Sequence, residues 1–139
     1  MEDLSQQRCV PCRGGDPVLN DEEISPLLEQ VPAWELDEVD GVKRLRRVFR
    51  FKNFAQALEF TNRVGEIAEA EDHHPTLLTE WGRVTVTWWT HAIKGLHKND
   101  FIMASRTDKL YTLASARANS TAQPDISGLG CFIFNAPGY

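Results

Sequence analysis

All four histidines in this 139-residue chain lie within one stretch that runs from Glu69 to Asp100, and three of them, His73, His74 and His91, are the candidates for chemistry. An imidazole group has an ordinary pKa of about 6.5, so it gives and takes protons near neutral pH. Histidines next to carboxylates are the residue types that general acid/base catalysis uses. A protonated histidine here could donate a proton to a hydroxyl group that leaves as water. The stretch therefore predicts proton-transfer chemistry.

A metal site is the main alternative within chemistry. Three histidines and a carboxylate suit zinc or non-haem iron. His73 and His74 are adjacent, however, and neighbouring side chains in an extended segment point to opposite sides. The spacing of a helical H-x-x-x-H metal motif is also absent. Residue chemistry alone favours acid/base catalysis over a metal site, and a structural role for the histidines also stays open.

Three further residues of the stretch are candidates for binding or support. Trp81 lies between the histidine pair and His91 in sequence, and a flat heteroaromatic ligand would gain from stacking on its ring. Glu69 falls just beyond the apolar stripe of the preceding helix, so it could be half-buried. Asp100 stands where a helix N-terminal residue is expected, and that position alone would explain it.

Cys9 and Cys12 form a C-x-x-C pair in a chain with three cysteines. An odd number argues against a disulfide framework. The pair could be half a zinc site or a redox pair, but further ligands at suitable spacing are missing. We therefore interpret it as two thiols on an N-terminal arm.

Five elements must position these residues, in the order helix, hairpin, helix, hairpin, helix. The first helix begins after Asn20 or Asp21, or after Ser25 with Pro26 as its first residue, and ends before Pro32. The other elements are a hairpin around an Asp-Gly turn, a strongly amphipathic helix, a second hairpin around a Trp-Gly turn and a last helix, over residues 34–51, 53–70, 76–90 and 99–116 respectively.

This order predicts an α+β fold: a two-layer sandwich of a four-stranded antiparallel sheet with helices on one face. Residues 1–19 are polar and rich in proline and glycine, and we expect a flexible N-terminal arm. We expect a single domain over residues 20–115 and a loosely structured C-terminal tail over residues 116–139. The position of Pro75 ends the central helix at or before the histidine pair.

Composition limits the cell compartment and the classes of partner that we expect for this chain. The net charge is −5, which argues against a nucleic-acid-binding surface, although residues 43–47 are locally basic. No apolar run approaches the length needed to span a bilayer, and the N-terminus has no secretory signal pattern. We expect a cytoplasmic protein without nucleic-acid or membrane partners.

The spaced pattern of the stretch resembles the pterin-4a-carbinolamine dehydratase family. It reads Glu69-x-x-x-His73-His74-Pro75, then Trp81, then Thr90-His91-x-x-x-Gly95-Leu96-x-x-x-Asp100. The resemblance covers roughly residues 20–115, and the order of the elements matches the family fold. The chain is most similar to the bacterial branch that accompanies phenylalanine hydroxylase, which shares the cysteine-pair arm.

The resemblance implies a reaction and a set of roles. The family removes water from 4a-hydroxytetrahydropterin to give quinonoid dihydropterin, so the pterin is the substrate and no other cofactor or metal is expected. His73 and His91 would be the acid/base residues, and His74 would bind the pterin and share the base role. Glu69 and Asp100 would support the histidines. Trp81 would form part of the wall of the site.

Family membership also implies partners. We expect a homodimer or homotetramer that works alongside phenylalanine hydroxylase. Animal members also bind a homeodomain transcription factor, so a protein-binding co-regulator of the same fold is an alternative function. Leu77 stands where some members have an aromatic residue, and the tail after residue 115 has no counterpart in the pattern.

Overall fold

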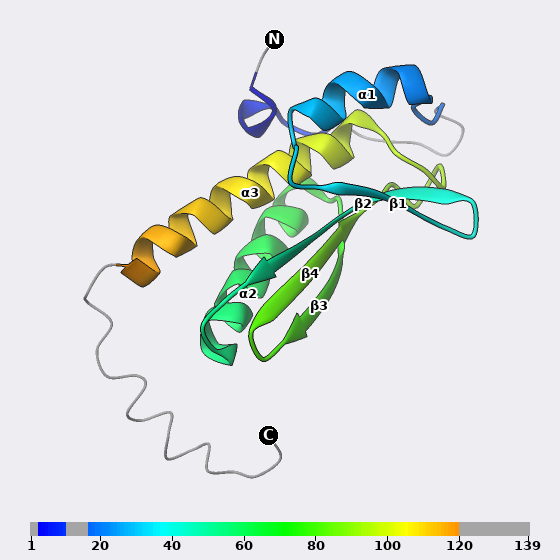
Figure 1. Cartoon of the computed structure of the whole chain (residues 1–139). Coiled ribbons are helices and arrows are strands. Elements are labelled where there is room, and N and C mark those ends of the chain that lie inside the picture. Colours follow the sequence, from blue (N-terminus) through cyan, green and yellow to red (C-terminus); the bar gives the residue numbers. More distant parts are fainter. Residues whose placement is uncertain (1–2, 11–16, 120–139) are drawn as a thin grey trace.

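A computed structural model describes residues 3–10 and 17–119, with side chains up to residue 114. It contains one four-stranded antiparallel sheet with the strand order β1-β2-β4-β3 and three α-helices (Figure 1). The elements are η1 (Leu4–Gln6), α1 (Asp21–Glu29), β1 (Glu35–Val39), β2 (Val42–Arg50), α2 (Phe54–Glu71), β3 (Thr76–Glu80), β4 (Arg83–Trp88) and α3 (Lys98–Asn119). The predicted α+β fold and its element order are confirmed.

Helix α2 and helix α3 cover one face of the sheet (Figure 1). The core between the two layers includes Leu45 and Phe49 of β2, Val86 of β4, Phe60 of α2 and Phe101 of α3, all at most 2% exposed. Burial of such apolar side chains is the main source of stability, at about 25 cal/mol per Å² removed from water.

The capping residues define the helices that lead into the site. Asn20 caps α1 through a reciprocal capping box with Glu23, so the helix begins at Asp21 and Pro26 lies inside it. The alternative start at Ser25 is wrong. Asn53 caps α2 by accepting a hydrogen bond from the backbone N–H of Gln56.

Helix α2 ends at Glu71, and Asp72 alone separates it from the histidine pair. Asp72 adopts a left-handed conformation with φ 51°, which stops the helix. The backbone N–H groups of Asp72 and His73 then donate to the carbonyl oxygens of Glu69 and Ala68 at 3.2 and 3.0 Å. These two bonds direct the chain from α2 into β3.

Arg47 explains the interruption in the apolar pattern of β2. It occupies the helix-facing row between Leu45 and Phe49, where its guanidinium pairs with Asp108 of α3 and lies 4.4 Å from the centre of the Phe49 ring. Trp34 donates to the same carboxylate at 2.8 Å. Burial, opposed by these partners, raises the pKa of the Asp108 carboxyl group.

The N-terminal segment packs against the domain. Residues 3–10, which we expected in a flexible arm, lie against α3, and Leu4 is 2% exposed within the core. Residues 11–16, including Cys12, and the tail beyond residue 119 lie outside the described residues. The division of the chain into arm, domain and tail stays a prediction. Over the described part of the chain, no helix is long and apolar enough to cross a membrane.

Candidate active site

His73 and Asp100 form the centre of the candidate site. His73 Nε2 lies 2.6 Å from Asp100 Oδ1, and the Asp100 side chain is fully buried. Asp100 Oδ2 accepts hydrogen bonds from the Thr90 hydroxyl at 2.7 Å and from the His97 backbone N–H at 2.9 Å. Both oxygens of the carboxylate therefore have partners, and its position in the first turn of α3 is favourable for a negative charge.

The ring of His73 is held on a second side by Trp88. The two rings are stacked, with centroids 5.7 Å apart and planes inclined by 6°. Trp88 is itself buried, and its indole N–H donates to the Thr107 hydroxyl at 3.1 Å. The His73 side chain keeps 11% of its surface exposed. Its ring is thus fixed in orientation yet reaches the surface, which is what a proton-transfer group needs.

The ring nitrogen Nδ1 of His73 has no hydrogen-bond partner among the described residues. With Nε2 bound to the carboxylate, a neutral imidazole would carry its proton there and present a lone pair at Nδ1. A protonated ring would present an N–H at Nδ1 while Asp100 balances its charge. The arrangement therefore suits His73 to accept a proton and to return it.

His74 turns to the other side of the chain and pairs with Glu69. Its Nε2 lies 2.7 Å from Glu69 Oε1, with both side chains more than half exposed. An exposed pair of this kind contributes little to stability. It can still orient the His74 ring toward a ligand. The structure thus joins each of the two adjacent histidines to a different carboxylate.

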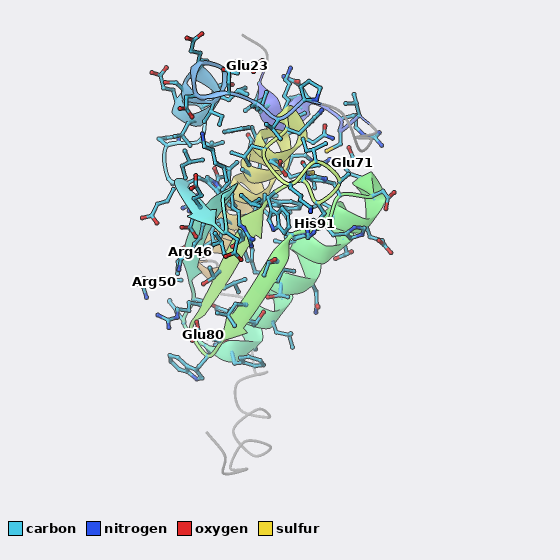
Figure 2. All side chains as sticks on the ribbon, turned by 90° about the vertical axis from the view of Figure 1, so that its right-hand side faces the viewer. Glu23, Arg46, Arg50, Glu71, Glu80 and His91 are labelled. Atoms are coloured by element: carbon cyan, nitrogen blue, oxygen red, sulfur yellow. The ribbon has the colours of Figure 1, made fainter. Side chains whose placement is uncertain are left out.

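His91 lies at the same end of the sheet as His73 and His74, in the turn that follows β4 (Figure 2). It is exposed, and its ring stacks on Trp89 with centroids 3.9 Å apart. The guanidinium of Arg44 lies 4.3 Å from the centre of the same Trp89 ring. His91 directly follows Thr90, whose hydroxyl binds Asp100, so His91 and His73 are linked through that carboxylate.

Trp81 does not lie with the histidines. It is 63% exposed in the turn between β3 and β4, next to Glu80. Figure 2 shows Glu80 and His91 at opposite ends of the hairpin. Since a strand advances about 3.3 Å per residue, five residues of β3 separate the turn from His74 by roughly 17 Å. Within one chain, the structure therefore separates Trp81 from the histidines, contrary to what we expected. A role for Trp81 in the wall of the site stays a prediction.

Several supporting residues were missed by the sequence analysis. The sequence pattern gave no role to Trp88, Trp89 or Arg44, and Thr90 appeared only as part of the family pattern. Their places depend on how β2 and β4 pair. Glu71 was not among the candidate residues either. Its side chain is 3% exposed, and hydrogen bonds from Arg8 and from the Cys9 backbone lower its pKa.

No group of three or more His, Cys, Asp or Glu side chains that could hold a metal ion occurs among the residues that the structure describes. Cys9, the one cysteine within the described residues, is a free, partly buried thiol near Glu71 and Arg106.

Comparison with known proteins shows which family this chain resembles. The family model described as pterin 4 alpha carbinolamine dehydratase matches residues 17–110. A relative from Syntrophotalea carbinolica, named "Putative pterin-4-alpha-carbinolamine dehydratase", is 59% identical over 110 residues, which span 79% of this chain and 98% of the relative.

A solved structure shares the fold. It is the crystal structure of a transcriptional coactivator/pterin dehydratase from Brucella melitensis, which is 32% identical to this chain with a TM-score of 0.62. The match covers 68% of this chain and 99% of the Brucella melitensis chain.

Proposed function

This chain belongs to the pterin-4a-carbinolamine dehydratase family, and we propose that it converts 4a-hydroxytetrahydropterin to quinonoid dihydropterin and water. The observation that supports this most strongly is the contact between His73 and the buried carboxylate of Asp100. It provides an oriented imidazole whose side chain is 11% exposed and whose Nδ1 has no hydrogen-bond partner among the described residues.

The reaction needs two proton transfers. The hydroxyl group on carbon 4a must gain a proton to leave as water, and nitrogen N5 must lose one as its electron pair forms the new double bond to carbon 4a. The protons balance, and neither oxidation nor reduction occurs. Positioned histidines suit this chemistry, and general acid/base catalysis contributes typically about 10²–10⁴-fold to a rate.

We assign His73 and His91 to the two proton transfers. His73 is held by Asp100 and Trp88, whereas His91 is held by its stack on Trp89, so both rings are oriented without blocking all of their nitrogens. The family pattern supports the same two residues.

We assign His74 and Glu69 to substrate binding. His74 Nε2 is bound to Glu69, and its ring is more than half exposed beside His73 in sequence. His74 could donate to or accept from a polar edge of the pterin ring, and it could share the base role. Trp81 is not included in this assignment because the structure separates it from the histidines.

The physiological setting proposed here follows from the resemblance alone. The enzyme would recycle the pterin of an aromatic amino acid hydroxylase, phenylalanine hydroxylase in particular, in the cytoplasm. It would act as a homodimer or homotetramer, with the pterin as substrate and without a metal or other cofactor. It would bind neither nucleic acid nor membrane.

A protein-binding role is the second candidate. It is favoured by the similarity to the Brucella melitensis protein, whose name includes transcriptional coactivator. The two roles use different properties, since partner binding does not need the proton-transfer chemistry of His73. A histidine metal site is the third candidate, and metal analysis of the purified protein tests it.

The test is a direct assay on purified protein. 4a-Hydroxytetrahydropterin is generated in place by a phenylalanine hydroxylase, and its decay is followed by absorbance with and without the protein. We expect faster decay that treatment with a chelator leaves unchanged. Decay at the background rate would refute the dehydratase, and stoichiometric bound metal on which activity depends would favour the metal site.

A further inference from the structure

The N-terminal segment lies across the junction between the C-terminal end of α2 and the N-terminal end of α3. Leu4 anchors it in the core at 2% exposure, and its short helix η1 packs on α3. Figure 2 shows Glu71, where this segment is attached, above His91 and far from Glu80 at the other end of the β3–β4 hairpin. Residues 8–10 form the part of the segment closest to the candidate site, and we call them the clasp.

Glu71, the last residue of α2, is the first attachment point of the clasp. The guanidinium of Arg8 donates to both of its carboxylate oxygens, from Nε at 3.0 Å to each, and the Cys9 backbone N–H donates to Oε1 at 2.9 Å. Arg106 of α3 adds a nitrogen at 3.3 Å from Oε1. One carboxylate with 3% exposure therefore joins the clasp, α2 and α3.

Asn99, in the first turn of α3, is the second attachment point. Its side-chain oxygen accepts from the Val10 backbone N–H at 3.0 Å, and its side-chain nitrogen donates to the Val10 carbonyl at 2.6 Å. The amide thereby binds the backbone as a neighbouring strand would. Asn99 is 2% exposed, and its own backbone N–H donates to His97 Nδ1 at 3.1 Å.

Both attachment points lie next to the two residues of the contact between His73 and Asp100. Glu71 is two residues before His73, and the intervening Asp72 already has a fixed left-handed conformation. Asn99 directly precedes Asp100. The clasp thus binds both chain segments whose separation sets the contact between His73 and Asp100.

We propose that the clasp, acting through Glu71 and Asn99, is a positioning element that holds His73 and Asp100 at their working separation. Its effect on catalysis rests on the dehydratase function proposed above. His73 and Asp100 come from different elements and meet through one contact of 2.6 Å. Catalytic geometry has a tolerance of roughly 0.5 Å, so such a pair needs rigid supports on both sides.

Two substitutions distinguish the effect of the clasp from that of the other contacts at the junction. Arg8→Met removes the exposed guanidinium but leaves the contact between Glu71 and Arg106, so it tests the clasp alone. Glu71→Gln keeps the shape of the side chain and removes the negative charge that Arg8 and Arg106 face. Arg83→Met is the matched control, because it breaks a similar guanidinium–carboxylate pair with Glu80 at the far end of the sheet.

Three measurements are made on the full chain with each substitution. Alkylation of Cys9, located by peptide mapping, reports whether the clasp is released. The ring ¹⁵N signals of His73 report its hydrogen bonding. Steady-state kinetics give kcat and KM. We expect both clasp variants to raise the Cys9 alkylation rate, shift the His73 signals, and lower kcat about three- to tenfold with KM within about twofold.

Two results would overturn the proposal. One is a released clasp, seen as faster alkylation of Cys9, with unchanged His73 signals and kcat. The other is an alkylation rate that neither substitution changes, which would show that Glu71 does not hold the clasp. If the wild-type protein has no dehydratase activity, the proposed function fails, while alkylation and the His73 signals still decide the positioning role.

Discussion

His73 Nε2 lies 2.6 Å from Asp100 Oδ1 across the junction between α2 and α3, and the carboxylate is fully buried. Twenty-seven residues of sequence separate the two. The contact requires that α2 end at Glu71, that the β3–β4 hairpin return the chain, and that α3 begin beside it. The fold of the whole domain therefore creates this pair.

Replacing Asp100 with Asn tests how the carboxylate acts. The amide nitrogen of Asn would face either His73 Nε2 or the two donors that now bind Oδ2, Thr90 and the His97 backbone N–H. The ring of His73 would lose its charge partner and change its tautomer. We expect kcat to fall by about 10² with a smaller change in KM. Unchanged kcat in a folded Asp100→Asn protein would exclude a supporting role for Asp100.

Two tryptophan substitutions separate the residues that support the site from those that do not. Trp89→Leu removes the ring on which His91 stacks at 3.9 Å, and we expect turnover to fall several-fold. Trp81→Leu, at the far turn of the hairpin, should leave turnover within about twofold of wild type. The same assay measures both variants. A larger loss from Trp81→Leu would return that residue to the site, by contact with another copy of the chain.

The clasp predicts a dependence of stability on pH. Hydrogen bonds from Arg8 and the Cys9 backbone lower the pKa of Glu71 from its ordinary value of 4.5. A carboxyl group with a lowered pKa stabilises the folded state above the ordinary value, and this contribution is lost as the pH falls through the lowered value. The difference in unfolding free energy between wild type and Glu71→Gln should therefore be constant above about pH 5 and shrink at lower pH.

Chemical denaturation at a series of pH values measures this difference. Trp81→Leu serves as the control for non-specific effects of acid, because it removes an exposed side chain and no ion pair. A difference that stays constant down to pH values well below 4.5 would show that Glu71 is not held as a charged group in the fold.

The thiol of Cys9 should be slow to react in the native protein. Burial, together with the nearby Glu71 carboxylate, raises its pKa from 9.0 to about 12. Because the thiolate is the reactive form, alkylation at pH 8 should be at least about tenfold slower in the native chain than in the urea-unfolded chain. Peptide mapping identifies the modified cysteine. Equal rates would show that the Cys9 thiol is not buried in the native protein.

The raised pKa of Cys9 also has a consequence for stability. The unfolded chain releases the Cys9 proton at its ordinary value of 9.0, whereas the folded chain retains it to about 12. Stability should therefore fall as the pH rises through this interval. In the Cys9→Ser variant, this part of the decrease should be absent.

The fold could be predicted because local signals determine its elements. Asn20, Asn53 and Pro75 mark helix boundaries, and the Asp-Gly turn marks the first hairpin. Along β4, the alternating apolar residues Val84, Val86 and Trp88 are all fully buried. Arg47 did not fit the pattern because its partner, Asp108, lies 61 residues away and no local signal identifies it.

The site could be predicted only in part. Proximity in sequence suggested that Trp81 and the histidines share a site, but the hairpin carries Trp81 to the opposite end of the sheet. Asp100 was recognised through the family pattern, whereas its contact with His73 depends on the register of whole elements. The docking of residues 8–10 left little trace in sequence, since three of the five hydrogen bonds described above use backbone groups of this segment. Leu4, an apolar residue in a polar segment, was the one local sign of it.

The most direct test of the proposed mechanism is kcat for His73→Ala and His73→Gln on 4a-hydroxytetrahydropterin. The Gln variant retains an amide group that can donate to Asp100 but cannot transfer protons, so it separates catalysis from packing. We predict that both variants fold and that kcat, after subtraction of the background reaction, falls by about 10²–10⁴-fold. Turnover within about threefold of wild type in either folded variant would contradict a catalytic role for His73.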